Sequence, residues 1–199
     1  MTASSKLRHL VEKNRSYRRF NQTKNITRDQ LIELVDLARL SASARNQQAL
    51  KFYLSNTEAQ NQQLFECLAW AGYLKDWSGP IEGERPAAYI VICNDTTISK
   101  NHFCDEGIAS QSILLGAVEM GLGGCMIAAI NKPKLTIALN LPEELEILLV
   151  LALGEPVEQV VIDEIKQGDY KYWRDTEQVH HVPKRSLEEL IINSQHTTS

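Results

Sequence analysis

The stretch "DEGIASQSILLGAVEMGLGGCMIAA", residues 105–129, determines the architecture that we expect. Residues 105–120 predict a long helix that is apolar on more than one face, which is typical of a helix at the centre of a domain or at a subunit contact. Gly121 is well placed to end this helix, because glycine readily adopts the left-handed backbone of a helix C-terminus. Residues 125–129 then predict a short buried strand. The stretch therefore predicts a central helix against a sheet.

The glycines of this stretch do not form a dinucleotide-binding fingerprint. In that fingerprint the glycines follow a strand and precede a helix. Here Gly121, Gly123 and Gly124 follow a helix and precede a strand. Their lack of a Cβ atom would let a flat ligand approach the backbone.

Further helices and strands surround the central stretch. The apolar runs 87–93 and 147–154 predict core strands, and residues 51–55 predict another. Two capping-box spacings, Thr27 with Gln30 and Ser186 with Glu189, predict helix starts. Further helices are expected at 5–13, 59–70 and 133–139. The order of elements indicates an α+β or α/β sandwich, followed by residues 155–185, which show little periodicity.

Composition indicates one domain over residues 1–199. The chain is 43% hydrophobic and carries a net charge of −4, which does not favour nucleic acid or an anionic membrane as a partner. The N-terminus lacks the apolar core of a secretory signal. The longest apolar run, 147–153, is too short to cross a bilayer. We therefore expect a soluble, cytoplasmic protein.

The cysteines and histidines do not indicate a metal site. No two cysteines have the CxxC spacing of zinc or dithiol sites, and free cysteine is often a small buried apolar residue. His102 and Cys104 lie close in sequence, but no third ligand is near. The four cysteines are Cys67, Cys93, Cys104 and Cys125.

The segment "SASARNQQALKFY", residues 41–53, carries more polar side chains than a helix-to-strand connection needs. One interpretation is an ordinary polar surface loop. The other is a loop that binds a planar ligand with a polar edge, because amide side chains both donate and accept hydrogen bonds.

Two basic clusters could bind an anion. "NRSYRRF", residues 14–20, combines arginines with a serine, and both side chains donate to anionic oxygens. The arginines could equally stabilise the C-terminus of the preceding helix. Lys184 and Arg185 precede a predicted helix N-terminus, where cations are unfavourable unless an anion binds between them and the free N–H groups. Both could instead be solvated surface cations.

These segments, taken in order, resemble the nitroreductase family of flavoproteins. The resemblance rests on "NRSYRRF", "SASARNQQALKF", "GLGGCMIAAIN" and "KRSLEEL", and covers nearly the whole chain. It implies an α+β fold with a central, mostly antiparallel sheet flanked by helices. It also implies a homodimer with FMN at the subunit interface, the long central helix at that interface, and a C-terminal extension onto the partner.

The resemblance also implies roles for individual residues. Arg15 and Ser16, with Lys184 and Arg185, would bind the FMN phosphate, and Arg18 would lie near the pyrimidine edge. The loop residues would reach the flavin of the other subunit, and the strand residues would line the ring, with the Ala128 N–H directed at N5. The loop residues are Ser43, Ala44, Asn46 and Gln48, and the strand residues are Met126, Ile127, Ala128 and Ala129.

The chain departs from the family pattern at three places. Asn14 stands where many members have an arginine, and Ala49-Leu50 replace a frequent Pro-Trp. Ala128 and Ala129 replace an acidic residue and glycine of some members, which is tolerable because the N5 contact uses the backbone.

The resemblance implies an oxidoreductase in which NADH or NADPH reduces the flavin at N5 and a small-molecule acceptor reoxidises it. Nitroaromatics, quinones or related compounds are the implied acceptors. The cofactor supplies the chemistry, so we expect no catalytic side chain. Tyr73 and Trp77 could form a substrate wall or simply pack at a helix end. The alternative function is a flavin-binding or redox-sensing module without turnover.

Overall fold

The computed structural model describes residues 3–193, with side chains from residue 6 onward. The described residues form two compact units. Unit 1 comprises residues 3–70 and 78–157, and unit 2 comprises residues 71–77 and 158–193. The single domain expected over residues 1–199 stays a prediction.

The described part of unit 1 contains a five-stranded sheet built around β5 (Leu145–Pro156). Along one edge of β5 lies β3 (Ala88–Asp95), which in turn pairs with β2 (Leu50–Ser55). Along its other edge lie β4 (Gly123–Ile127) and the short β1 (Phe20–Asn21). Every pairing is antiparallel, so the mostly antiparallel sheet is confirmed.

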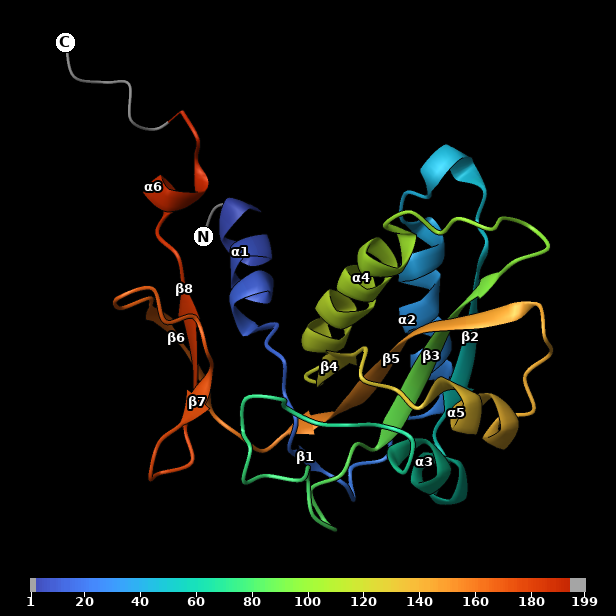
Figure 1. Cartoon of the computed structure of the whole chain (residues 1–199), viewed down its shortest axis with the longest axis horizontal. Coiled ribbons are helices and arrows are strands. Elements are labelled where there is room, and N and C mark those ends of the chain that lie inside the picture. The colour runs from blue at the N-terminus through green and yellow to red at the C-terminus, as the bar shows by residue number, and fades with distance from the viewer. Residues whose placement is uncertain (1–2, 194–199) are drawn as a thin grey trace. The chain divides into compact units, whose positions relative to one another are not determined.

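Helices cover both faces of this sheet. On one face, α2 (Arg28–Leu40) and α4 (Asp105–Glu119) bury a cluster that includes Ile90 and Ile92 of β3. Alternate residues of a strand point to opposite faces. Tyr89 and Val91 of β3 therefore face the other side, where they are fully buried. That side holds α3 (Glu58–Phe65), which lies next to α5 (Lys132–Ala138), as Figure 1 shows.

The ends of α2 and α4 form as their sequences predict. Thr27 and Gln30 make both hydrogen bonds of the capping box at the start of α2. At the end of α4, Gly121 has φ 75°, its N–H donates to Val118 O, and Leu122 N–H donates to Ala117 O. These two bonds form a Schellman motif, which satisfies carbonyls that the helix would leave without partners. The chain then turns directly into β4.

The helix predicted over residues 59–70 is wrong at its C-terminal end. The regular helix ends at Phe65, and Leu68 forms an isolated antiparallel bridge with Ile130. The Ala69 N–H donates to Ala129 O at 2.9 Å. Pairing with the segment after β4 therefore replaces the last helical turn, and this non-local contact is not visible in the local sequence pattern.

Unit 2 contains strands that the sequence interpretation missed. In its described residues, β8 (His180–Lys184) pairs in parallel with β6 (Val160–Glu164) and antiparallel with β7 (Trp173–Arg174). Ser186 and Glu189 form the predicted capping box, but α6 (Leu187–Leu190) is a single turn that ends before the expected Ile192.

The chain's described helices include none that is both long and apolar enough to cross a membrane. The first helix, α1 (Ala3–Lys13), belongs to unit 1 and contacts α4.

Candidate functional site

The loop between α2 and β2, residues 41–48, has a strained backbone. Arg45, Asn46 and Gln48 have φ of 54°, 55° and 53°, in the left-handed region that residues with a Cβ rarely adopt. Arg45 and Asn46 belong to the single 3₁₀ turn η1 (Ala44–Asn46). Each such residue costs about 1–3 kcal/mol unless its surroundings enforce it, and such residues cluster at functional sites. Three of them within four positions therefore mark this loop as a candidate site.

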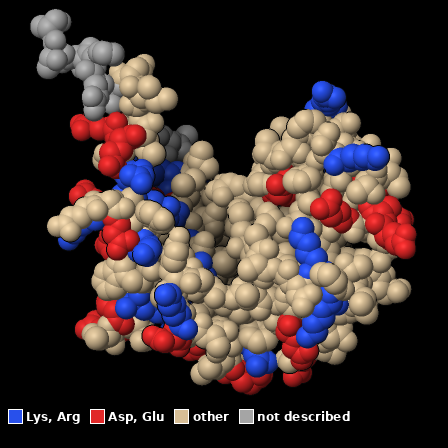
Figure 2. Space-filling model, viewed as in Figure 1, with Lys and Arg blue, Asp and Glu red and all other residues tan. Residues whose placement is uncertain are grey.

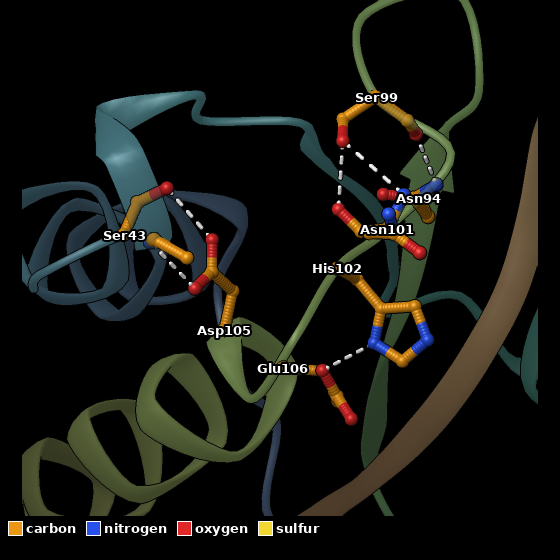
Figure 3. A network of polar contacts seen from close by, with 8 residues as sticks. Ser43, Asn94, Ser99, Asn101, His102, Asp105 and Glu106 are labelled. Carbon is orange, nitrogen blue, oxygen red and sulfur yellow. Dashed lines mark hydrogen bonds and ion pairs between the residues drawn. The ribbon is translucent and has the colours of Figure 1, made fainter.

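Asp105, the first residue of α4, holds one end of the loop. Its side chain accepts a hydrogen bond from the Ser43 hydroxyl at 2.7 Å and from the Ala44 N–H at 2.9 Å, as Figure 3 shows. The Ser43 hydroxyl oxygen also accepts the Gln48 N–H at 3.0 Å. Asp105 is 6% exposed, so these bonds lie largely out of water. Ser43 and Ala44 thus anchor the loop to the start of α4.

Other contacts join the same loop to the segment that precedes α4. Ser99 donates to Gln47 Oε1 at 3.1 Å. The Arg45 guanidinium lies 5.8 Å from the centroid of the Phe103 ring. Figure 3 shows how Asn94 and Asn101 in turn bind Ser99, which fixes this segment to the end of β3.

The side-chain amides of Asn46 and Gln48 bind each other rather than Asp105. Gln48 Nε2 donates to the backbone and side-chain oxygens of Asn46 at 3.3 and 3.2 Å. Asn46 and Gln48 thus form a pair of neighbouring amides. Next to them, a cavity of about 150 Å³ is lined by residues that include Ser43, Gln48 and Asp105.

The first basic motif, residues 14–20, contacts β4. The Tyr17 N–H donates to Gly124 O at 3.0 Å, and Ser16 forms a parallel bridge with Gly124. Arg18 Nη1 donates to the Ser16 carbonyl at 3.0 Å. Arg15 Nη2 donates to the Val11 carbonyl at 2.8 Å, whereas its Nε is buried without a partner among the described residues.

Gly123 and Gly124 leave space for this contact within the protein rather than for a ligand. A Cβ on Gly123 would lie 2.6 Å from the Tyr17 ring, and one on Gly124 would lie 2.6 Å from the Ala152 carbonyl oxygen. Such distances are far shorter than any real contact, so only glycine fits at these two positions. The close approach expected for a flat ligand is therefore made by the protein itself at Gly123 and Gly124.

The strand residues predicted to line the ring lie at the end of β4. Met126 is 38% exposed, whereas Ile127 is 5% exposed. Ala128 and Ala129 are exposed just beyond the strand. The first basic motif and this surface are therefore brought together through Gly124.

The strained loop lies at the other end of α4. The loop binds Asp105, whereas Gly124 packs against Leu114, nine residues further along the helix. At 1.5 Å per residue this separation is about 13 Å along the axis. Figure 1 shows the loop beyond the N-terminal end of α4 and β4 near its C-terminal end. Within one chain, the predicted residues thus form two groups.

The remaining predicted residues belong to unit 2. Lys184 ends β8, and Arg185 lies between β8 and α6, with its Nη1 3.8 Å from Glu189 Oε1. Tyr73 packs against Tyr172 with ring centroids 4.9 Å apart, and the Arg174 guanidinium lies 4.4 Å from the Trp77 ring centroid. These contacts favour packing as the role of both aromatic residues.

Another cavity of unit 1 contains none of the predicted site residues. It measures about 1040 Å³ and lies between α3 and residues 82–87. Tyr89 borders it, and burial raises the pKa of this phenol. Its volume alone does not indicate a reaction, because a ligand site also needs a few convergent polar groups.

A family model for the nitroreductase family matches residues 11–78 and 83–155. The chain belongs to the nitroreductase family. The matched segments contain both groups of unit 1, including Arg15, Asp105 and the strained loop, together with Tyr73 and Trp77. They do not include Lys184 and Arg185.

Solved structures from this family have the same fold. A nitroreductase family protein from Clostridium novyi NT is 26% identical, with a TM-score of 0.62 over 75% of this chain and 85% of that chain. A protein proposed to be an NADH dehydrogenase/NAD(P)H nitroreductase, from Parabacteroides distasonis ATCC 8503, is 24% identical, with a TM-score of 0.64 over 89% and 97%. An FMN-dependent nitroreductase from Clostridium difficile R20291 is 19% identical, with a TM-score of 0.61 over 75% and 87%.

Nitroreductase family membership makes this protein an oxidoreductase of the nitroreductase type, and the family typically uses a flavin. The residues present fit such a group. The buried Arg15 Nε has no partner among the described residues, and leaving such a donor unsatisfied costs about 1–3 kcal/mol. A phosphate oxygen would satisfy it. The paired amides of Asn46 and Gln48 offer the donors and acceptors that a pyrimidine edge requires.

Sequence reasoning missed Asp105, Ser99 and Phe103. The sequence interpretation used Asp105 only as the first residue of the predicted long helix. The signal that could have identified Asp105 was an acidic residue at the start of one helix together with a polar loop whose donors need an acceptor. That pairing depends on the packing of α2 against α4, which no local pattern gives.

Proposed function

We propose that the protein is an FMN-dependent oxidoreductase that uses NADH or NADPH to reduce electrophilic acceptors such as nitroaromatics and quinones. The observation that carries the proposal is the strained loop 41–48 at one end of α4, combined with the unpartnered Arg15 Nε beside β4. The FMN-dependent relative from C. difficile and the NAD(P)H-related relative from P. distasonis support the choice of cofactor and donor.

Each group of residues has a proposed task. Arg15 and Ser16 bind the phosphate, and Lys184 and Arg185 are further phosphate ligands on the strength of the sequence resemblance. Arg18 stabilises negative charge at the pyrimidine edge, because a nearby cation lowers the energy of an anion. Met126, Ala128 and Ala129 would contact the ring, and Ile127, which is buried, would support them. When bound, FMN supplies hydride acceptance and donation at N5, so the protein provides position and electrostatics.

The loop completes the site of the other subunit in this proposal. One chain's loop lies about 13 Å along α4 from its own β4. A two-fold axis that packs two α4 helices antiparallel brings the loop of each chain toward the β4 of its partner. Asn46 and Gln48 then read the pyrimidine edge, while Ser43 and Ala44 fix the loop.

The outer surface of α4 suits contact with a second copy. Ile108, Leu115 and Val118 lie at helical spacing on its exposed or half-buried side. Figure 2 shows few charged side chains over this helix. An apolar, weakly charged helix face of this kind favours burial in a homodimer.

The first test is the visible spectrum of the purified protein before and after anaerobic NADH or NADPH. A flavin spectrum that bleaches with a nicotinamide and recovers with a quinone or nitroarene supports the proposal. Bleaching without turnover on any acceptor supports the flavin-binding module instead. A protein that contains no flavin and takes up no added FMN contradicts both.

The shared site has its own test, in which two inactive variants are mixed. Arg15→Met removes the phosphate side, and Asn46→Ala with Gln48→Ala removes the loop side. Random reassociation of the two chains makes half of the dimers mixed, and each mixed dimer holds one intact site, so about a quarter of all sites recover. If each site lies within one chain, mixing restores none.

A further inference from the structure

We infer that Asp105 is a positioning residue for the flavin: it locks the loop 41–48 in its strained conformation and so presents Asn46 and Gln48 to the pyrimidine edge. This inference rests on the proposed function, because it assigns a task to the loop in that site. It adds a residue outside the loop that sets the loop's geometry.

The first step is the donor arrangement around Asp105. Both side-chain oxygens are used, one for the Ser43 hydroxyl and one for the Ala44 N–H. The carboxylate is 6% exposed, so water competes little for these donors. Hydrogen bonds to an ionised acceptor are about twice as strong as neutral ones.

The second step is the relay from Asp105 to Gln48. Because the Ser43 hydroxyl donates its hydrogen bond to Asp105, its oxygen is oriented to accept one from the Gln48 N–H. Gln48 is itself left-handed, with φ 53°. The Asp105 carboxylate therefore binds Ala44, at one end of the strained segment, directly. It is linked to Gln48, at the other end, through Ser43.

The third step is that Asp105 is a buried charged anchor for this backbone, whereas the bonds of Asn46 N–H to Ser43 O and of Gln48 Nε2 to Asn46 lie within the loop itself. Arg45, Asn46 and Gln48 are not buried, so apolar packing does not drive the strain. The contacts from Ser99 and Phe103 reach only Gln47 and Arg45. Without Asp105, the segment can relax, and the paired amides then lose their fixed direction.

The test compares Asp105→Asn with Glu106→Gln. Glu106 is a matched control because it is the neighbouring acid in the first turn of α4 and contacts His102 rather than the loop, as Figure 3 shows. Both substitutions remove one negative charge from the same helix N-terminus. Any effect of the helix dipole is therefore common to the two variants.

Two readouts separate positioning from folding. In the protein without flavin, hydrogen exchange at the Ala44 and Gln48 amides is expected to speed up in Asp105→Asn and to stay unchanged in Glu106→Gln. In titrations with FMN, Asp105→Asn is expected to bind about 10- to 100-fold more weakly, as the loss of charged hydrogen bonds predicts. The visible circular dichroism of bound flavin is also expected to change.

Ser43→Ala keeps the inference testable if Asp105→Asn folds poorly. It removes the relay and retains the carboxylate, and it should weaken FMN binding in the same direction. Faster exchange of the loop amides with unchanged FMN affinity overturns the inference, as does an equal loss in Glu106→Gln. A wild-type protein that binds no FMN would instead refute the proposed function, while the exchange data still report what Asp105 does to the loop.

Discussion

The Tyr17 N–H donates to the carbonyl oxygen of Gly124 at 3.0 Å, which joins the first basic motif to the strand that follows α4. The contact is possible only because residues 123 and 124 lack side chains. It links two segments more than one hundred residues apart in the chain. The geometry of Arg15 and Ser16 relative to β4 thus depends on two glycines.

We predict that Gly124→Ala destabilises the protein and weakens flavin binding. The new Cβ would lie 2.6 Å from both the Ala152 carbonyl oxygen and Leu114 Cδ2. Overpacking of this kind costs about 1–3 kcal/mol. Denaturant unfolding measures the loss, and Gly72→Ala is the control, because its Cβ meets nothing within 4 Å. Equal stability of both variants would contradict the packing argument.

A second prediction concerns Arg15, which we expect to contribute to ligand binding at the expense of the unliganded fold. Arg15→Met removes a buried Nε that has no partner among the described residues. The melting temperature of the flavin-free protein should therefore stay the same or rise, while FMN affinity falls about 10- to 100-fold. Arg8→Met is the control, because Arg8 is exposed and pairs with Glu12. A lower melting temperature with unchanged FMN affinity would show that Arg15 is purely structural.

Much of unit 1 was predictable because its signals are local. The capping boxes, the left-handed Gly121 and the β-rich runs each depend on residues within a few positions of one another. These signals placed α2, α4, α5 and the main strands within a few residues of their observed bounds.

The parts that sequence reasoning missed depend on non-local contacts. The early end of α3 follows from pairing with residues after β4, and the strands of unit 2 are short, with an apolar run only in β6. The site residues named by resemblance include residues of the loop 41–48 and residues at the end of β4. Asp105 and Ser99 lie behind the loop and were visible only after α2 and α4 had been placed side by side.

A third prediction concerns pH and His181 in unit 2. Its ring lies between two carboxylates, with Nδ1 2.6 Å from Asp163 and Nε2 3.2 Å from Asp175, and it stacks on Trp173. Burial lowers the pKa of His181, but the hydrogen bonds to Asp175 and Asp163 outweigh it and raise the pKa above its ordinary value. The hydrogen bond from His181 in turn lowers the pKa of Asp175.

The signs of these two shifts define a window of stability. A raised histidine pKa stabilises the fold below the ordinary value of about 6.5, and this contribution is lost as pH rises through the raised pKa. A lowered aspartate pKa stabilises the fold above about 3.9, and this contribution is lost as pH falls through the lowered pKa. The protection of the β8 amides, corrected for the intrinsic pH dependence of hydrogen exchange, should thus be greatest at mildly acidic pH. His181→Gln should remove the loss of β8 protection on the alkaline side of this window. His9→Gln, an exposed control on α1, should leave the pH dependence unchanged.

The last prediction tests the packing role of Trp77 and its partner Arg174. Arg174 Nη2 lies 2.8 Å from Glu158 Oε2, and the two side chains are 8% and 1% exposed. Arg174→Met breaks this buried ion pair, and breaking such a pair costs about 3–5 kcal/mol in comparable cases. Replacing Glu158 by Gln as well should recover much of the loss, because the buried negative charge is then removed too. Exposed Lys171→Met is the control. If Arg174→Met alone leaves thermal unfolding unchanged but alters KM for an acceptor, the pair of Trp77 and Arg174 belongs to a substrate surface and the packing assignment is wrong.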